Sequence, residues 1–206
     1  MEIKNKALYI YNTISEIYHD AHCELNYNNI FELTIATILS AQTTDKVVNS
    51  CTNALFSKYP DCNKLAKANI NDIIDIIKVV GLASNKAKNI INLSNVLVHD
   101  YNGIVPSDFD ELIKLPGIGR KTANVIRAEG FKEPGLAVDT HVKRVSNRLG
   151  LANSSDPDVI EKELKDLYDE SLWGDVHLKL LFFGRYFCTS KNPNCNNCPF
   201  IKICNK

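Results

Sequence analysis

The amino-acid sequence predicts an all-α protein. Alanine, leucine, isoleucine and lysine recur at spacings of three and four residues through most of the 206 residues, which is the period of a helix. Alternation of apolar and polar residues, the pattern of a half-buried strand, does not persist long enough anywhere to predict a sheet. Gly81, Gly130 and Gly150 fall where helical patterns stop, and glycine commonly follows a helix end. We therefore expect helices joined by short loops.

Each predicted helix rests on an apolar stripe, and several have a capping residue near the start. In chain order the predicted helices cover residues 2–18, 30–41, 44–58, 70–79, 84–99, 108–114, 120–129, 140–149, 156–168 and 173–186. Residues that can cap a helix N-terminus are Asp45, Ser84, Ser107, Asp139 and Asp156. The main loops lie at residues 100–107 and 130–138, and Pro134-Gly135 in the second loop marks the expected boundary between sub-regions.

Composition excludes a membrane span and leaves a polyanion partner open. No apolar run approaches the ~18 residues of a transmembrane helix, and no apolar signal core follows the N-terminus, so we expect a cytoplasmic protein. Lys+Arg and Asp+Glu both number 24, but the charges are uneven. Residues 111–150 carry eight basic and four acidic side chains, whereas residues 151–175 carry two basic and eight acidic ones. The first region predicts a surface for a polyanion.

The most distinctive motif, at residues 115–125, reads Leu-Pro-Gly-Ile-Gly-Arg-Lys-Thr-Ala-Asn-Val. Pro116 is expected to end the preceding helix, because it lacks a backbone donor. Gly117 and Gly119 allow positive φ and put no side chain over the backbone, so the next helix begins with bare N–H groups. Such a helix start binds anions, phosphate in particular. Lys121 lies in its first turn, beside the predicted anion site; the structural alternative is a plain αα-hairpin with an exposed lysine.

A cysteine quartet near the C-terminus predicts a metal centre. Four of the seven cysteines lie in the last 19 residues, with the spacing C-x6-C-x2-C-x5-C. The four are Cys188, Cys195, Cys198 and Cys204. Without a signal peptide, such clustering favours a metal over disulfides. Zinc and an iron–sulfur cluster both take four thiolates, and the single C-x2-C pair leans toward iron–sulfur.

Five segments together resemble the endonuclease III family of DNA glycosylases, in the helix-hairpin-helix superfamily. They are residues 39–45, 80–82, 115–125, 137–142 and the cysteine quartet. Each segment alone is modest evidence, but all five occur in the order and at the spacing of the family. The resemblance spans residues 25–204, nearly the whole chain.

The resemblance implies two helical domains with a DNA-binding groove between them. One is a six-helix domain at residues 22–132 that carries the helix-hairpin-helix motif, and the other combines residues 1–21 with residues 133–206. The cysteine quartet of the second domain would hold a [4Fe–4S] cluster, not zinc. The hairpin, with Gly117 and Gly119, would bind a DNA phosphate, often with a monovalent cation on its carbonyls. We expect a monomer that acts on double-stranded DNA containing a damaged pyrimidine or an abasic site.

The implied reaction is base excision of an oxidised pyrimidine, followed by strand cleavage 3′ to the abasic site by β-elimination. By resemblance, the amine of Lys121 attacks the sugar C1′, displaces the base and forms a Schiff base. The helix start and Arg120 supply positive potential that favours a neutral, nucleophilic amine. Asp139 would stabilise positive charge on the sugar and move protons to and from the lysine. Outside the family, Asp139 is simply a helix N-cap.

The target base must leave the stack, and other side chains must fill the gap. The resemblance implies that Gln42 enters the duplex facing the orphan base and that Leu82 wedges in from a second loop. The remaining predicted DNA contacts are Arg120, His141, Arg144, Arg185 and Lys191. Lys191 is the single basic residue between Cys188 and Cys195, so we expect weaker non-specific DNA binding than in relatives with a basic loop.

Two other functions compete with this interpretation. Adenine-mismatch glycosylases share the hairpin, the aspartate and the cluster, but they lack a lysine at the position of Lys121 and carry a glutamate where this chain has Ile38. A non-catalytic iron–sulfur protein would use the hairpin only to hold DNA, and Asp139 argues against it. Lys121 and Ile38 thus favour the lyase-competent enzyme over an adenine-mismatch glycosylase, and Asp139 favours it over a binding protein.

Overall fold

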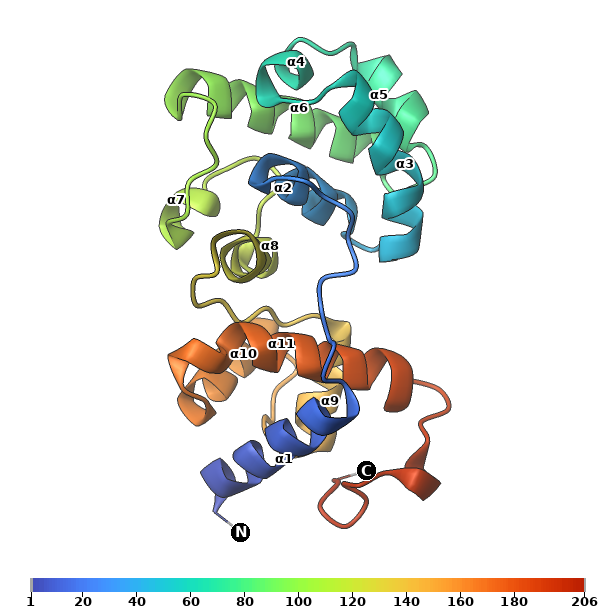
Figure 1. Ribbon diagram of the computed structural model, residues 1–206, viewed down its shortest axis with the longest axis vertical. Helices are drawn as coiled ribbons and strands as arrows, with labels where there is room; N and C mark the ends of the chain where they lie inside the picture. The colour runs from blue at the N-terminus through green and yellow to red at the C-terminus, as the bar shows by residue number, and fades with distance from the viewer. Residues whose placement is uncertain (1, 206) are drawn as a thin grey trace. The chain divides into compact units, whose positions relative to one another are not determined.

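The chain folds into helices only. The structure, a computed structural model, describes residues 2–205, and every regular element in that range is helical (Figure 1), which confirms the all-α prediction. The chain divides into two compact units, the central unit at residues 24–132 and the terminal unit, formed by residues up to 23 and residues from 133. Within residues 2–205, no helix is both long and apolar enough to cross a membrane.

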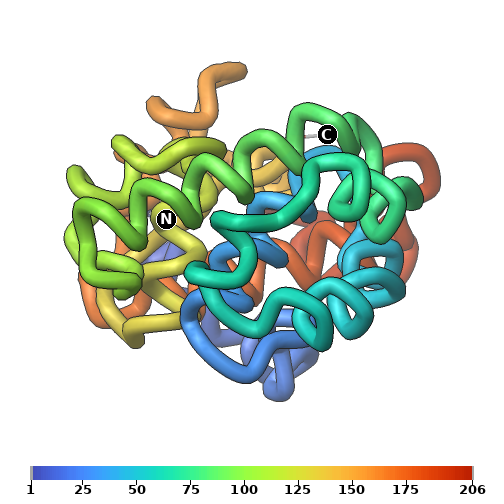
Figure 2. The backbone as a smooth tube through the Cα atoms, turned by 90° about the horizontal axis from the view of Figure 1, so that it is seen from above, coloured from blue at the N-terminus to red at the C-terminus, as the bar shows by residue number. Residues whose placement is uncertain are grey.

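The central unit is built around one buried helix. Its helices are α2 (Ile30–Leu39), α3 (Asp45–Lys58), α4 (Cys62–Ala66), α5 (Ile70–Ile77), α6 (Ala83–Asp100), α7 (Phe109–Leu112) and α8 (Arg120–Val125), the last continued by a π-helical segment, Ile126–Phe131. Every residue from 32 to 39 of α2 is buried, as expected of a helix that is apolar all round. Helix α2 packs against α3, α6 and α8, while α4 and α5 lie along α6 (Figure 2).

The terminal unit joins the two ends of the chain. It contains α1 (Ile3–Ile17), α9 (Thr140–Arg148), α10 (Pro157–Leu167), α11 (Trp173–Phe182) and a π-helical segment, Phe183–Phe187, with 3₁₀ turns at Glu170–Leu172 and Cys195–Asn197. Phe200, fully buried, packs edge-on against Phe183 and Tyr9, with ring centroids 5.3 and 5.9 Å away. These aromatic contacts anchor the C-terminal segment to α1 and to the helix that follows α11.

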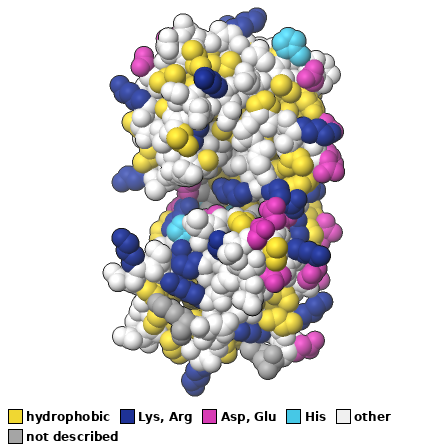
Figure 3. All heavy atoms as spheres, turned by 180° about the vertical axis from the view of Figure 1, so that it is seen from behind, with side chains coloured by type: hydrophobic (Ala, Val, Ile, Leu, Met, Phe, Trp, Pro, Cys, Tyr) yellow, Lys and Arg dark blue, Asp and Glu magenta, His cyan; other side chains and the backbone are white. Residues whose placement is uncertain are grey.

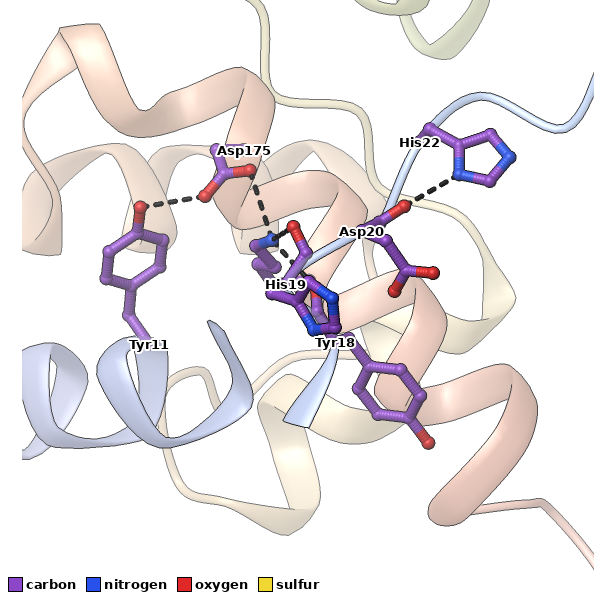
Figure 4. A network of polar contacts seen from close by, with 7 residues as sticks. Tyr11, Tyr18, His19, Asp20, His22 and Asp175 are labelled. Carbon is purple, nitrogen blue, oxygen red and sulfur yellow. Dashed lines mark hydrogen bonds and ion pairs between the residues drawn. The ribbon is translucent and has the colours of Figure 1, made fainter. Parts of the chain in front are cut away.

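A polar network ties the end of α1 to α11 (Figure 4). The Nζ of Lys179 donates to the carbonyl of Tyr18 at 2.8 Å and lies 3.7 Å from the Asp175 carboxylate. The hydroxyl of Tyr11 donates to the other oxygen of Asp175 at 2.7 Å. Lys179 is buried, and its amine is matched by carbonyls of Tyr18 and His19, the two residues that follow α1.

The central unit differs from the sequence predictions at α4 and at Gly130. Helix α4 was not predicted, because its five residues are too short to show a helical period; Asp61 caps it by accepting from the Lys64 N–H at 2.8 Å. The helix expected to stop at Gly130 continues to residue 131, and Lys132 adopts the left-handed conformation, with φ of 55°. Gly130 lets this segment pack closely on α2, because a Cβ there would lie 3.1 Å from the Leu33 side chain.

The predicted caps are partly right. Asp139 and Asp156 cap α9 and α10 with their carboxylates. Helix α7 is capped by Asp108 rather than by Ser107. The N-cap residue of α6 is Leu82, which offers no side-chain cap, so Ser84 lies inside the helix. Capping thus follows local hydrogen bonding, which a sequence places only to within a residue or two.

Alkaline pH is expected to destabilise the terminal unit through Tyr168. Burial raises the pKa of Tyr168 well above its ordinary value of about 10. The folded chain therefore keeps a proton that the unfolded chain loses, so this stabilisation is complete below about pH 10 and declines as pH rises further. Tyr168→Phe should remove that share of the decline and, at neutral pH, cost about 0.5–1.5 kcal/mol through the lost hydrogen bond to the Ala7 carbonyl, 3.1 Å long. Urea unfolding at neutral pH and above about pH 10 measures the free energy of unfolding of both proteins. If that free energy falls with alkaline pH as steeply in the variant as in the wild type, the prediction is wrong.

Candidate functional site

The hairpin at residues 113–119 is held by two buried apolar residues and by backbone hydrogen bonds. Leu115 and Ile118 are buried, and the Ile118 N–H donates to the Leu115 carbonyl at 3.1 Å. Gly117 has φ of +80°, which is the left-handed region that favours glycine. A Cβ at this position would also lie 3.0 Å from the Cβ of Asn89 on α6. The turn therefore requires a glycine at residue 117 for both reasons.

Gly119 differs from Gly117, and the expectation of positive φ is wrong there. Its φ is −103°, which any residue adopts, and a Cβ at this position would meet no atom within 4 Å. Gly119 is the N-cap residue of α8, and no side chain caps that helix. The bare helix start predicted from the sequence is therefore present, but the fold itself does not require a glycine at residue 119.

Two basic residues open α8. The guanidinium of Arg120 lies 5.0 Å from the ring centroid of Phe109, a cation–π contact that joins the two helices of the hairpin. Lys121 follows and is half-buried. Its amine forms no hydrogen bond or ion pair with any residue of the described range 2–205. Lys121 therefore presents an uncommitted amine beside the uncapped helix start.

Gln42 and Leu82, the two predicted wedges, share an uncommon backbone conformation. Their φ values are 54° and 60°, and among the described residues only two other non-glycine residues have positive φ. Leu82 is 61% exposed, although it is a large apolar residue, and Gln42 is also exposed. The carbonyl of Gln42 lies 3.9 Å from where a Cβ on Gly81 would stand, so the two loops are neighbours in the central unit. Strained, exposed side chains of this kind concentrate at functional sites.

Asp139 caps α9 with a single oxygen. Its Oδ1 accepts from the N–H groups of His141 and Val142 at 2.9 and 2.8 Å. Within residues 2–205, its Oδ2 has no hydrogen-bond partner, and the side chain is half-buried. The cap thus fixes the carboxylate and leaves one oxygen for another role.

His141 and Arg144 are held inside the terminal unit. The guanidinium of Arg144 donates to the carbonyls of Cys188 and Gly184 at 3.1 and 2.6 Å, and it lies 3.2 Å from the Nδ1 of His141. Burial lowers the pKa of Arg144. These contacts give Arg144 a structural task, so its direct contact with DNA stays a prediction, as does that of His141.

Sequence reasoning missed Arg148, one turn further along α9. Its guanidinium donates to the Sγ of Cys188 at 3.2 Å and to the carbonyls of Thr189 and Ser190 at 2.8 and 3.2 Å. The sequence does show that Arg144 and Arg148 share one face of α9, because they are four residues apart. Their target, about 40 residues away, was not visible in the sequence.

The cysteine quartet is gathered in one part of the terminal unit. Cys188 is buried in the hydrophobic core, and Cys198 and Cys204 pack against the same core. Burial raises the pKa of Cys198, and the thiols of the other three add to the rise, so all four are close enough to interact. Within residues 2–205 no disulfide forms, and no three potential ligands are grouped tightly enough to hold a metal ion as they stand.

The two other predicted basic contacts lie at the end of the terminal unit. Arg185 is half-buried in the π-helical segment, and Lys191 is exposed in the loop between the first two cysteines of the quartet. On the face in Figure 3, Lys and Arg side chains are interspersed with Asp and Glu side chains over both units. The structure thus holds the predicted residues in two groups: Gln42, Leu82 and the hairpin in the central unit, and the others in the terminal unit.

Comparison with known proteins gives consistent matches. The model of the HhH-GPD superfamily base excision DNA repair proteins matches residues 35–170. The endonuclease III of Bacillus subtilis is 45% identical over 192 residues, which are 93% of this chain and 88% of the relative. The endonuclease III of Thermotoga maritima is also 45% identical, over 84% of this chain and 80% of its own.

Solved structures agree with these relatives. A trapped endonuclease III–DNA covalent intermediate is 43% identical, with a TM-score of 0.96 over 100% of this chain and 97% of the other. A non-covalent endonuclease III–DNA complex matches with the same identity and TM-score. A thermostable thymine-DNA glycosylase, 24% identical with a TM-score of 0.85, shares the fold.

Proposed function

This chain belongs to the endonuclease III family of HhH-GPD base excision DNA repair proteins, and we propose how its own residues carry out the reaction. The protein is a base excision repair DNA glycosylase that acts on duplex DNA. The proposal is that it removes oxidised pyrimidines through a lysine Schiff base and then cleaves the strand 3′ to the abasic site. A cytoplasmic location belongs to the same proposal, supported by the bacterial origin of these relatives.

Lys121 is the residue on which the proposal depends most. Its amine has no partner in the described chain and stands beside the uncapped start of α8, where backbone N–H groups attract a phosphate. In the proposed reaction the amine attacks C1′ and the bond from C1′ to the base breaks. Opening of the sugar gives an imine between Lys121 and C1′, and loss of a C2′ proton then expels the 3′ phosphate.

Asp139 supports this reaction from the terminal unit. We propose that its Oδ2, which has no partner among residues 2–205, stabilises the positive charge that grows on the sugar as the base leaves. The same oxygen can exchange protons with the lysine between steps. Gln42 and Leu82, exposed and strained, are proposed to fill the gap that the extruded base leaves.

We also propose that the cysteine quartet holds a [4Fe–4S] cluster. Three of the four thiols lie in or against one hydrophobic core, and four thiolates are the donor set that such a cluster takes. Arg148, which donates to the Cys188 sulfur and to the carbonyls of Thr189 and Ser190, would hold this end of the quartet in place. When bound, the cluster supplies structure rather than chemistry, because it fixes the C-terminal segment.

Borohydride trapping on a defined duplex tests the proposed function. The substrate carries a single thymine glycol, and an undamaged duplex of the same sequence is the control. We expect a covalent protein–DNA adduct with the damaged duplex alone, and strand cleavage when borohydride is left out. Base release without any adduct would indicate a monofunctional glycosylase, and neither product would indicate a non-catalytic DNA-binding protein.

The two hairpin glycines should respond differently to substitution. Gly117→Ala forces a side chain into positive φ and against Asn89, and it should cost about 1–2 kcal/mol of folding stability. Gly119→Ser suits an N-cap and meets no atom, so the free energy of unfolding should hold or rise slightly. The serine would nevertheless occupy the proposed phosphate site. Urea unfolding and DNA-binding titrations measure the two effects; unchanged DNA affinity in Gly119→Ser contradicts the phosphate site.

A further inference from the structure

Lys86 is a buried lysine whose amine is fully used inside the central unit. It lies near the start of α6 and is only 4% exposed. Its Nζ donates to the carbonyls of Leu39 and Ala41 at 2.8 and 2.7 Å and to the Oγ1 of Thr43 at 3.0 Å. An ammonium has three donors, and each is matched here by one oxygen. The acceptors span the end of α2 and the loop that follows it.

A buried charge of this kind is costly unless its surroundings stabilise it. Burial lowers the pKa of Lys86, and the nearby Cys51 thiol opposes that shift. The carbonyls at the C-terminal end of α2 carry the negative end of the helix dipole, which favours a cation there. Because an apolar residue of similar length would fill the same space without a buried charge, the three hydrogen bonds indicate a task beyond packing.

Lys86 is bonded to both loops that carry a strained, exposed side chain. Gln42 lies between Ala41 and Thr43, which both accept from the Lys86 amine. The backbone N–H of Lys86 donates to the carbonyl of Leu82 at 3.0 Å. The side chain of Lys86 therefore fixes the chain on each side of Gln42. Its backbone bond to Leu82 is the ordinary first bond of α6, which any non-proline residue at this position would make. Both Gln42 and Leu82 adopt positive φ, which persists only where neighbouring contacts enforce it.

We propose that Lys86 is a positioning residue whose amine holds the loop of Gln42 in the shape that enters duplex DNA. The proposal rests on the proposed function, because the two wedges matter only if a base is extruded. Because Lys86 is buried, it acts through the Gln42 loop rather than by touching DNA itself. Its loss should therefore impair base extrusion far more than cleavage at a site that has no base to extrude.

Lys86→Met tests this, because methionine keeps the apolar stem and removes the ammonium. Lys88→Met, an exposed lysine on the same helix, is the matched control. We expect Lys86→Met to slow release of thymine glycol from a duplex by about 10- to 100-fold, the cost of misplacing groups remote from the chemistry. Cleavage of a preformed abasic site should stay close to wild type, and the control should match wild type on both substrates.

Three outcomes are informative. Equal losses on both substrates, corrected for the folded fraction, would overturn the proposal in favour of a merely structural lysine. Unimpaired base release would overturn it as well. The wild-type protein is assayed on both substrates in the same experiment. If it acts on neither, the proposed function is refuted instead.

A milder variant covers the case in which Lys86→Met does not fold. Thr43→Val removes one of the three acceptors and leaves the lysine in place. It should show a smaller loss confined to base release, and equal losses on both substrates again count against the proposal. A fluorescent 2-aminopurine placed opposite the lesion adds a direct readout, because insertion of Gln42 changes its stacking. Lys86→Met should reduce that fluorescence change, whereas a purely structural role predicts a normal change per folded molecule.

Discussion

Lys121→Ala is expected to abolish the borohydride-trapped adduct and strand cleavage while leaving the fold intact. The amine is the proposed nucleophile, and alanine has no group that can form an imine. Lys121 makes no hydrogen bond or ion pair with residues 2–205, so its removal leaves no buried group unsatisfied. Alanine also favours the helix in whose first turn Lys121 lies. Adduct formation on denaturing gels and thermal unfolding measure the two effects.

Lys114→Ala is the matched control for this experiment. Lys114 lies on the same hairpin, is exposed, and pairs with Glu111 at 2.6 Å. An exposed pair of this kind is screened by solvent and contributes little to stability, so the variant should fold and should still form the adduct. An adduct that survives in Lys121→Ala would assign the nucleophile to a different amine and overturn the proposed role. Loss of the adduct in both variants would point instead to weakened DNA binding by the hairpin.

The helices that the sequence predicted are those whose pattern is local and long. Apolar spacing located α1, α2, α3 and α6 to within a few residues, because each buries one face or its whole surface. Helix α4 is too short to show a period. The π-helical turns after residues 125 and 182 were missed because they depend on packing rather than on composition.

The same distinction holds for the candidate site. Gly117 and Asp139 could be predicted, since a tight turn and a helix cap are determined within a few residues of chain. The contacts of Lys86 and Arg148 could not, because their acceptors lie about 40 residues or more away. The left-handed conformations of Gln42 and Leu82 were likewise invisible, since neither residue type favours positive φ. Tertiary contacts impose those conformations.

Asp139→Asn is expected to slow base removal by about 10²–10⁴-fold, the range of a general acid–base group, with little change in stability or DNA affinity. Asparagine caps a helix about as well as aspartate, so its side-chain oxygen can still accept from the N–H groups of His141 and Val142. What it lacks is the negative charge on the second oxygen. Single-turnover base release, thermal unfolding and DNA-binding titrations separate these effects.

Asp156→Asn is the matched control, because Asp156 caps α10 in the same unit by accepting from the Asp158 N–H at 2.9 Å. It should change neither stability nor turnover. Asp139→Ala completes the set: it removes the charge and the cap together, so it should lose turnover as Asp139→Asn does and about 0.5–2 kcal/mol of stability besides. Full turnover in Asp139→Asn would reduce Asp139 to a helix cap. If Asp139→Asn loses turnover but keeps its stability, the negative charge of the carboxylate is needed for the reaction itself.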